Sequence, residues 1–275
     1  MLIGVACGDA ESEIEQDLAT VSHAPQEPIT LEAAGVSLTI DPDYGARVTS
    51  FQYQGREMLQ TTPDAEGNNT GGTVWPSPQS DWDWPPPPQI DTGRYSVRKL
   101  RDNVYLFESQ VDTSVDLSLE KRVQMAANGE VAFRYRLKNE SAYPKIVAVW
   151  EVTRVPYDGY IRFPLSDTVY VNEGRLPLEA KEDFGYIYFD GQNTEAQKVF
   201  ATLRDTAVQY VHDGLVFTKN TVITARNQTA PGQMPLEVFM EPRRGFAEFE
   251  LQGGRYRLES GQSATFRTKW RLEAE

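Results

Sequence analysis

Residues 36–53 read Val36-Ser-Leu-Thr-Ile40, then Asp41-Pro-Asp-Tyr-Gly45, then Ala46-Arg-Val-Thr-Ser-Phe-Gln-Tyr53. In the first and third of these runs, apolar and polar residues alternate with a period of two. This alternation is typical of a β-strand that buries one face. The middle run contains Pro and Gly, which favour a turn. The stretch therefore predicts an antiparallel hairpin.

The same pattern continues along the chain. Residues 130–137 place Val131, Phe133, Tyr135 and Leu137 on one face, and Asp213-Gly214 is a dipeptide suited to the turn of a tight hairpin. No segment has a helical period longer than a turn or two, found at most around residues 176–183. Roughly fourteen or more short strands without an interior linker predict an all-β chain, a single large antiparallel β-sandwich. The late predicted strands are Leu236–Met240, Phe246–Leu251, Tyr256–Leu258 and Ala264–Leu272.

The chain has 275 residues and is acidic, because 27 Lys and Arg against 40 Asp and Glu give a net charge of −13. Binding to nucleic acid needs clustered positive charge, so we expect no nucleic-acid partner. Six acids and no Lys or Arg lie in residues 1–30, which leaves −7 for residues 31–275. We interpret residues 1–30 as a separate segment, mostly a disordered acidic tether that ends at Pro25 and Pro28, and residues 31–275 as one β-sandwich domain.

The N-terminus, Met1-Leu-Ile-Gly-Val-Ala-Cys7-Gly-Asp9, is similar to the end of a bacterial lipoprotein signal peptide, in which small residues precede the Cys that is lipidated. If Cys7 carries lipid, the protein lies at the bacterial cell envelope, in the periplasm or on the surface, and this anchor is its one membrane contact. If Cys7 is an ordinary free thiol, the protein is soluble. With one Cys and two His, we expect no metal and no cofactor.

One segment of the domain has an unusual composition: Trp75-Pro-Ser-Pro-Gln-Ser-Asp-Trp-Asp-Trp-Pro-Pro-Pro-Pro88 contains three of the five Trp and six Pro. Proline removes backbone donors and fixes φ, so we expect a stiff extended loop and no central strand. Indoles beside carboxylates suit a pyranose, whose C–H faces stack on aromatic rings while its hydroxyls donate to acids. Alternatively, the indoles form a small core at one end of the sandwich. The candidate saccharide-binding residues in this loop are Trp75, Asp81, Trp82, Asp83 and Trp84.

Residues 35–59 resemble the opening hairpin of the galactose mutarotase-like superfamily, which includes aldose 1-epimerases and hexose-6-phosphate epimerases. The Gly-Gly and Trp-Pro pairs in residues 71–76 resemble the glycine and aromatic-proline segment of the latter group. Residues 137–154 and 245–272 are similar to the strands that carry the central site and close the fold. The resemblance covers about residues 31–273 and implies a β-supersandwich with a sugar-accepting face.

For an enzyme, the resemblance implies a His general acid and a carboxylate general base that together open and close the pyranose ring. This chain departs from the pattern at the acid. Trp150 and Glu151 stand where one family His is implied, and another is implied within Gln89-Ile-Asp91-Thr-Gly93. Of the two His present, His23 lies in the tether. His212 adjoins the Asp213-Gly214 turn, either as a solvated hairpin residue or at the edge of the sugar face.

Glu248 and Glu250 share one face of a predicted strand, and we favour Glu248 as the base. Alternatively, both acids pair with neighbouring arginines. Glu151 follows an apolar run, so it either faces a cleft or is paired, for example with Arg154. The candidate catalytic residues are therefore Glu248, Glu151 and His212. The further candidates for substrate binding are Arg154, Lys219 and Glu241.

We predict a monomeric carbohydrate-binding protein of mutarotase-like fold, whose partner is a mono- or oligosaccharide and whose catalysis the sequence leaves open. The first alternative is an active sugar epimerase or related carbohydrate-active enzyme that uses Glu151 and Glu248 as a carboxylate pair. The second alternative is a structural surface lipoprotein without a small-molecule site. Loop indoles that face acids across a cleft favour the first two functions, whereas a dry indole cluster favours the third.

Overall fold

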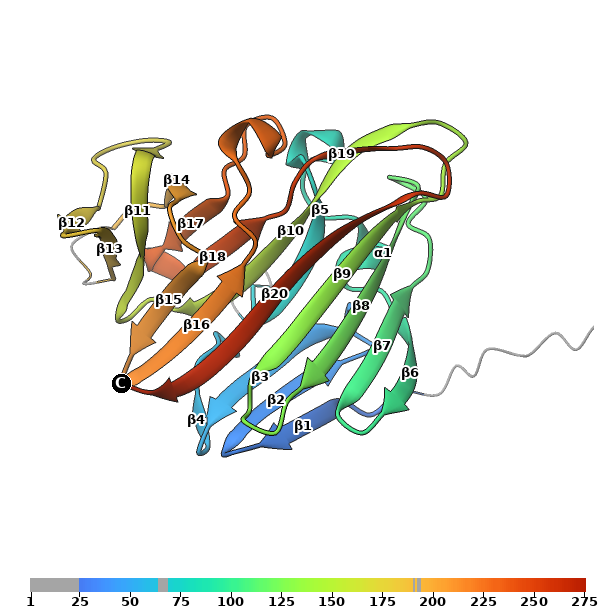
Figure 1. Cartoon of the computed structure of the whole chain (residues 1–275), viewed down its shortest axis with the longest axis horizontal. Helices are drawn as coiled ribbons and strands as arrows, with labels where there is room; N and C mark the ends of the chain where they lie inside the picture. Colours follow the sequence, from blue (N-terminus) through green and yellow to red (C-terminus); the bar gives the residue numbers. More distant parts are fainter. Residues whose placement is uncertain (1–24, 64–68, 190, 192–193) are drawn as a thin grey trace, which may run out of the picture.

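A computed structural model describes residues 25–63, 69–189, 191 and 194–275, and this part is almost entirely antiparallel β-structure (Figure 1). Its helices are short: α1 (Pro88–Asp91) and the 3-10 turns Gln79–Asp81, Arg226–Gln228 and Pro242–Arg244. The strands are β1 (Ile29–Ala33), β2 (Val36–Asp41), β3 (Arg47–Tyr53), β4 (Arg56–Glu57), β5 (Gly72–Ser77), β6 (Tyr95–Arg101), β7 (Val104–Ser109), β8 (Leu117–Met125), β9 (Val131–Asn139), β10 (Lys145–Pro156), β11 (Tyr160–Val171), β12 (Glu179–Lys181), β13 (Phe184–Tyr188), β14 (Gln197–Leu203), β15 (Ala207–His212), β16 (Leu215–Thr221), β17 (Leu236–Glu241), β18 (Phe246–Gln252), β19 (Tyr256–Leu258) and β20 (Ser263–Ala274).

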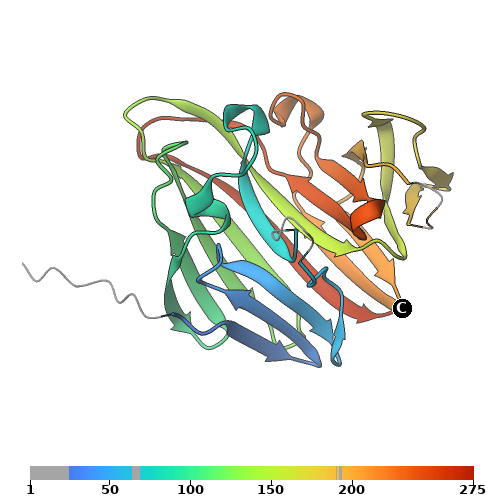
Figure 2. The same ribbon diagram turned by 180° about the vertical axis from the view of Figure 1, so that it is seen from behind.

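The strands form two facing layers. One layer has the order β6–β7–β8–β9–β20–β16–β15–β11–β13–β12. The other has the order β1–β2–β3–β5–β10–β18–β17–β14–β11 and is turned toward the viewer in Figure 2. β11 belongs to both layers, and its register with β14 shifts between Leu165 and Val169. The chain is thus the large antiparallel β-sandwich that the alternation predicts.

Aromatic side chains from both layers meet in the core. Phe51 of β3 contacts Phe217 of β16 and Trp270 of β20 edge to face, with ring centroids 5.1 and 5.6 Å apart. Phe249 of β18 packs against Phe217 in the same way, at 5.3 Å. These rings are buried, and burial of such large apolar surfaces is the main stabilising contribution in a sandwich.

The predicted hairpin is confirmed, because β2 pairs with β3 around the turn at residues 41–45. Val131, Phe133, Tyr135 and Leu137 are all buried, as their shared face predicts. Asp213 and Gly214 have φ values of 49° and 66°, the positive values that a tight hairpin turn requires. The late strands appear as β17 to β20, with bounds that differ by at most two residues.

The first described strand begins slightly before residue 31. β1 starts at Ile29, and the Gln26 side chain donates to Asp43 Oδ1 and to the Tyr95 carbonyl at 3.0 and 2.9 Å. The end of the predicted tether is therefore fixed to the sandwich. Cys7, His23 and the rest of residues 1–24 lie outside the described residues.

The expectation of a loop throughout residues 75–88 is wrong for its first three residues, which belong to β5. Trp75, Pro76 and Ser77 pair with Trp150, Val149 and Ala148 of β10. Proline is tolerated here because β5 pairs along its length with β10 alone, while its pairing with β3 is limited to Gly72 opposite Val48. Beyond Ser77 the chain leaves the sheet, as predicted.

Candidate functional site

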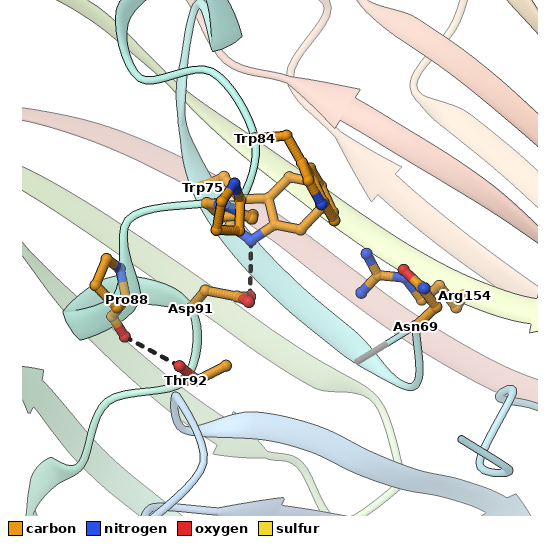
Figure 3. A pocket seen from close by; sticks show the side chains of 9 residues that line it. Asn69, Trp75, Trp84, Pro88, Asp91, Thr92 and Arg154 are labelled. Carbon is orange, nitrogen blue, oxygen red and sulfur yellow. Dashed lines mark hydrogen bonds between the residues drawn. The ribbon is translucent and has the colours of Figure 1, made fainter. Parts of the chain in front are cut away.

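The segment that follows β5 folds over the outer face of β5 and β10 and forms a cleft of about 300 Å³ there. Figure 3 shows Arg154 and Asn69 on one side of this cleft, facing two indoles and Asp91 on the other. We call it the Trp84 cleft. It is lined by Asn69, Trp75, Trp84, Pro85, Pro86, Pro88, Asp91, Thr92 and Arg154.

Asp91 is the polar centre of one wall. It is buried at the end of α1, and its Oδ1 accepts hydrogen bonds from Arg47 Nη2 at 2.7 Å, Trp75 Nε1 at 2.8 Å and Thr73 Oγ1 at 3.1 Å. Arg47 is itself fully buried; burial lowers its pKa and the charge of Asp91 opposes that effect. This ion pair therefore fixes α1 and the proline-rich loop onto β3 and β5.

Gly45 lets α1 approach the hairpin turn closely. Its φ is +68°, and a Cβ atom placed on it would lie 1.9 Å from the Asp91 carbonyl oxygen. Any side chain at this position would push Asp91 away from its partners. The turn of the fold-determining hairpin thus also supports the site.

Arg154 of β10 forms the opposite wall and is 1% exposed. Its Nε donates to Glu248 Oε1 of β18 at 2.7 Å, and its guanidinium lies 5.2 Å from the centre of the Trp75 ring. The two residues are directly opposite each other in the register of β10 and β18. Glu248 therefore supports the cleft by holding Arg154. The partner of Arg154 is thus Glu248 and not Glu151, the partner suggested by the sequence.

The loop indoles have two different environments. Trp75, Trp82 and Trp150 pack together, with Trp75 edge to face against Trp150 at 5.2 Å and against Trp82 at 6.1 Å. Trp82 also donates from Nε1 to the Pro76 carbonyl at 3.0 Å. Trp84 is 56% exposed and lies edge to face on Trp75 at 6.0 Å. The loop thus contains both a small core and a displayed ring.

A second polar cluster lies beside the cleft on the same face of the sheet. Lys198 of β14 binds Glu237 and Glu250 at 2.7 and 2.8 Å, and Trp150 Nε1 donates to Glu250 at 2.7 Å. Burial raises the pKa of Glu250 to about 8; Lys198 opposes this effect, while Glu237 and Glu248 add to it. Burial alone would lower the pKa of Lys198, but the two carboxylates raise it.

The raised pKa of Glu250 predicts a dependence of stability on pH. The folded state binds a proton more tightly than the unfolded state, whose Glu pKa is about 4.3. The resulting stabilisation is fully present below that value and is lost as the pH rises through about 8. We expect the unfolding free energy of the wild type to fall relative to Glu250→Gln between about pH 5 and 9, measured by urea unfolding. Glu32→Gln, on the exposed side of β1, is the control; parallel wild-type and Glu250→Gln curves would contradict the prediction.

The predicted pair of Glu151 and Glu248 does not face a common ligand. Glu151 points into the core, where its Oε1 accepts from Tyr135 at 2.7 Å and Thr268 at 2.8 Å, and its Oε2 lies 3.1 Å from Lys219 Nζ. Glu248 lies on the outer face of the sheet with Arg154. Because neighbouring residues of a strand point to opposite faces, positions 151 and 154 cannot share one cleft.

Lys219 is fully buried, which corrects the expectation that it rims the sugar face. Burial lowers its pKa, opposed by the charge of Glu151. It also donates a hydrogen bond to Thr153 and lies 4.3 Å from the Phe249 ring centre. Its role in this structure is to neutralise Glu151 in the core.

The remaining candidates lie away from the walls of the Trp84 cleft. His212 is part of β15, where it stacks on Tyr210 and lies 3.8 Å from Asp158. Glu241 ends β17. Asp83 is exposed, and Asp81 lines a separate cavity of about 170 Å³ with Trp82. These four residues gain no site role from the geometry.

Several residues of this region are absent from the sequence-based candidates: Arg47, Asn69, Asp91, Lys198 and Glu237. Asp91 had a usable signal, since it lies where the family resemblance implies a His. Lys198 and Glu237 had no such signal, because the sequences of their strands resemble those of any other strand in the sheet. Within the described ranges, no three His, Cys, Asp or Glu side chains gather as metal ligands, and no helix is long and apolar enough to cross a membrane.

The fold agrees with solved structures described as a putative aldose 1-epimerase and as galactose mutarotase-like proteins. A putative aldose 1-epimerase from Escherichia coli K12 superposes with a TM-score of 0.68 at 12% identity, over 90% of this chain and 99% of that one. A galactose mutarotase-like protein from Clostridium acetobutylicum gives 0.65 at 11%, over 90% and 95%. One from Lactobacillus casei gives 0.63 at 13%, over 90% and 100%. The chain has the galactose mutarotase-like fold. No family model and no curated protein matches the sequence.

In this mutarotase-like fold, the two positions at which the resemblance implies histidines are connected by Trp75. Trp75 donates to Asp91 at one position and packs against Trp150 at the other. Trp150 in turn donates to Glu250. An indole N–H is a donor with no basic lone pair, so it is not a general acid or base near neutral pH. The two positions implied for proton transfer are therefore linked by indoles that donate to Asp91 and Glu250.

Proposed function

We propose that the protein binds a mono- or oligosaccharide in the Trp84 cleft without isomerising it. The observation that carries this proposal is the 56% exposed indole of Trp84 in one cleft with the buried polar side chains of Arg154 and Asp91. A pyranose can stack a C–H face on the indole while its oxygens meet the polar wall. The likeness to structures described as aldose 1-epimerases and mutarotases also supports a carbohydrate ligand.

Trp84→Ala is the direct test of saccharide binding. We expect binding to weaken by at least about 1 kcal/mol, the scale of one aromatic contact. Retention of the wild type and the variant on a glycan array, followed by titration with the sugars retained, measures the change. Tyr170→Ala, which removes a 40% exposed ring from β11 outside the cleft, should bind like the wild type. Equal retention of Trp84→Ala would sink the proposal.

The site gives little support to epimerase activity. Trp150 occupies a position implied for the acid, and Glu151 and Glu248 lie on opposite faces of the sheet. We therefore expect freshly dissolved glucose and galactose to mutarotate at the same rate with and without the protein in polarimetry. A rate that rises with the wild type and falls back with Glu248→Gln would restore the enzyme alternative.

The alternative of a structural surface lipoprotein and the location at the cell envelope rest on residues other than Trp84. A surface lipoprotein without a ligand site agrees with the packed indoles of Trp75, Trp82 and Trp150, but leaves the exposure of Trp84 unexplained. An envelope location stays a proposal supported by the residues around Cys7, which lie outside the described part of the chain.

A further inference from the structure

Arg154 has an unused donor in the wall of the Trp84 cleft. The residue is 1% exposed, its Nε is bound to Glu248, and its Nη1 has no hydrogen-bond partner among the residues that the structure describes. Water satisfies such donors on a protein surface, but a buried guanidinium needs acceptors from its surroundings. Arg154 is one of the residues that line the cleft in which we propose that the saccharide binds.

One oxygen of each acid at the cleft is already engaged. Asp91 Oδ1 accepts from Arg47, Trp75 and Thr73, and Glu248 Oε1 accepts from Arg154 Nε. Each carboxylate is thus paired with a buried guanidinium. Among the described residues that line the cleft, the buried side-chain atom without a hydrogen-bond partner is Arg154 Nη1.

The donor of Arg154 that lacks an acceptor indicates the chemistry of the ligand. A sugar hydroxyl that accepts from Arg154 also brings a proton that needs its own acceptor, whereas an ionised carboxylate brings acceptors alone. Hydrogen bonds between guanidinium and carboxylate are also shorter and stronger than neutral ones. A dianionic phosphate is less suitable, because it would place two negative charges beside Glu248, which shares the same arginine.

We propose that the ligand is an acidic saccharide and that Arg154 binds its carboxylate. This inference rests on the proposed saccharide-binding function and defines the class of sugar. Trp84 then contacts the face of the uronate ring, and Trp75, beneath the Arg154 guanidinium at 5.2 Å, holds the plane of the guanidinium.

The experiment compares ligands that differ only at the carboxyl group. Oligoglucuronate, oligogalacturonate and oligomannuronate are each titrated against the full chain beside their methyl esters, in calorimetry at constant salt. We expect at least one acid to bind about tenfold or more tightly than its ester. Arg154→Lys, which keeps the charge but removes the planar fork, should weaken binding of the acid more than binding of the ester and so remove most of this difference.

Two further variants separate loss of folding from loss of recognition. Arg154→Gln combined with Glu248→Gln preserves a neutral hydrogen-bonded pair, so it should fold and bind acid and ester equally. Trp84→Ala should weaken binding of both forms. If acid and ester bind wild type equally and both depend on Trp84, the proposed function stands and the acidic assignment is overturned. Tighter binding of hexose 6-phosphates than of all three uronates also overturns it, whereas no binding of any saccharide overturns the proposed function itself.

Discussion

Replacement of Asp91 by alanine is expected to lower the unfolding free energy by about 3–5 kcal/mol, the cost of breaking a buried ion pair by removing one partner. Arg47, which is fully buried, would lose its ion pair with Asp91, and Trp75 and Thr73 would lose their acceptor. The ion pair that fixes α1 and the proline-rich loop onto β3 and β5 would be lost, so saccharide binding should be lost as well.

Urea unfolding at pH 7 measures this effect. Asp91→Asn, which keeps an acceptor oxygen but not the charge, should fall between the wild type and the alanine variant. Asp81→Ala changes an exposed acid of the same loop and should behave like the wild type. A loss of less than about 1 kcal/mol in Asp91→Ala would show that Arg47 reaches other acceptors or water, and the assignment of Asp91 as the centre of the wall would be wrong.

The second large effect concerns the core. Lys219→Met should destabilise the protein by about 3–5 kcal/mol, because it leaves the Glu151 carboxylate buried without a cation. Glu151 is 1% exposed, and its hydrogen bonds from Tyr135, Thr268 and Trp270 supply dipoles but no compensating charge.

The double variant Lys219→Met with Glu151→Gln tests the cause. The glutamine keeps an oxygen that accepts from Tyr135 and Thr268 and removes the charge, so most of the lost stability should return, as measured by thermal unfolding. If the double variant is no more stable than Lys219→Met, the loss comes from packing of the lysine stem against Phe249 and Trp270 and the electrostatic account fails.

The fold is readable from the sequence because its main signal is local. In β2, β3 and β9 one face is buried and the other is not, so the period of two is visible residue by residue. The Asp213-Gly214 turn is local in the same sense, since two adjacent positive φ values require such residues. The proline content led to the wrong prediction of a loop at Trp75–Ser77. The sequence does not reveal that β5 pairs along most of its length with a strand on one side only, where proline is tolerated.

The partners of the charged residues could not be predicted in the same way. Arg154 and Glu248 are separated by 94 positions, and Lys219 and Glu151 by 68. β10 is buried along nearly all of its length, so its sequence does not show which of two adjacent residues points to the core. Our sequence-based pairing of Glu151 with Arg154 joined residues of one strand, whereas the actual partners depend on which strands lie beside β10.

β10 also limits how the molecule can misfold. Its successive residues alternate between two unrelated polar networks, with Glu151 and Thr153 inside the sandwich and Trp150 and Arg154 outside it. A slip of one residue against β18 would exchange the faces of β10, which would place the Glu151 carboxylate on the outer face and the Arg154 guanidinium among the core aromatics. The buried charges of this strand therefore disfavour a one-residue slip.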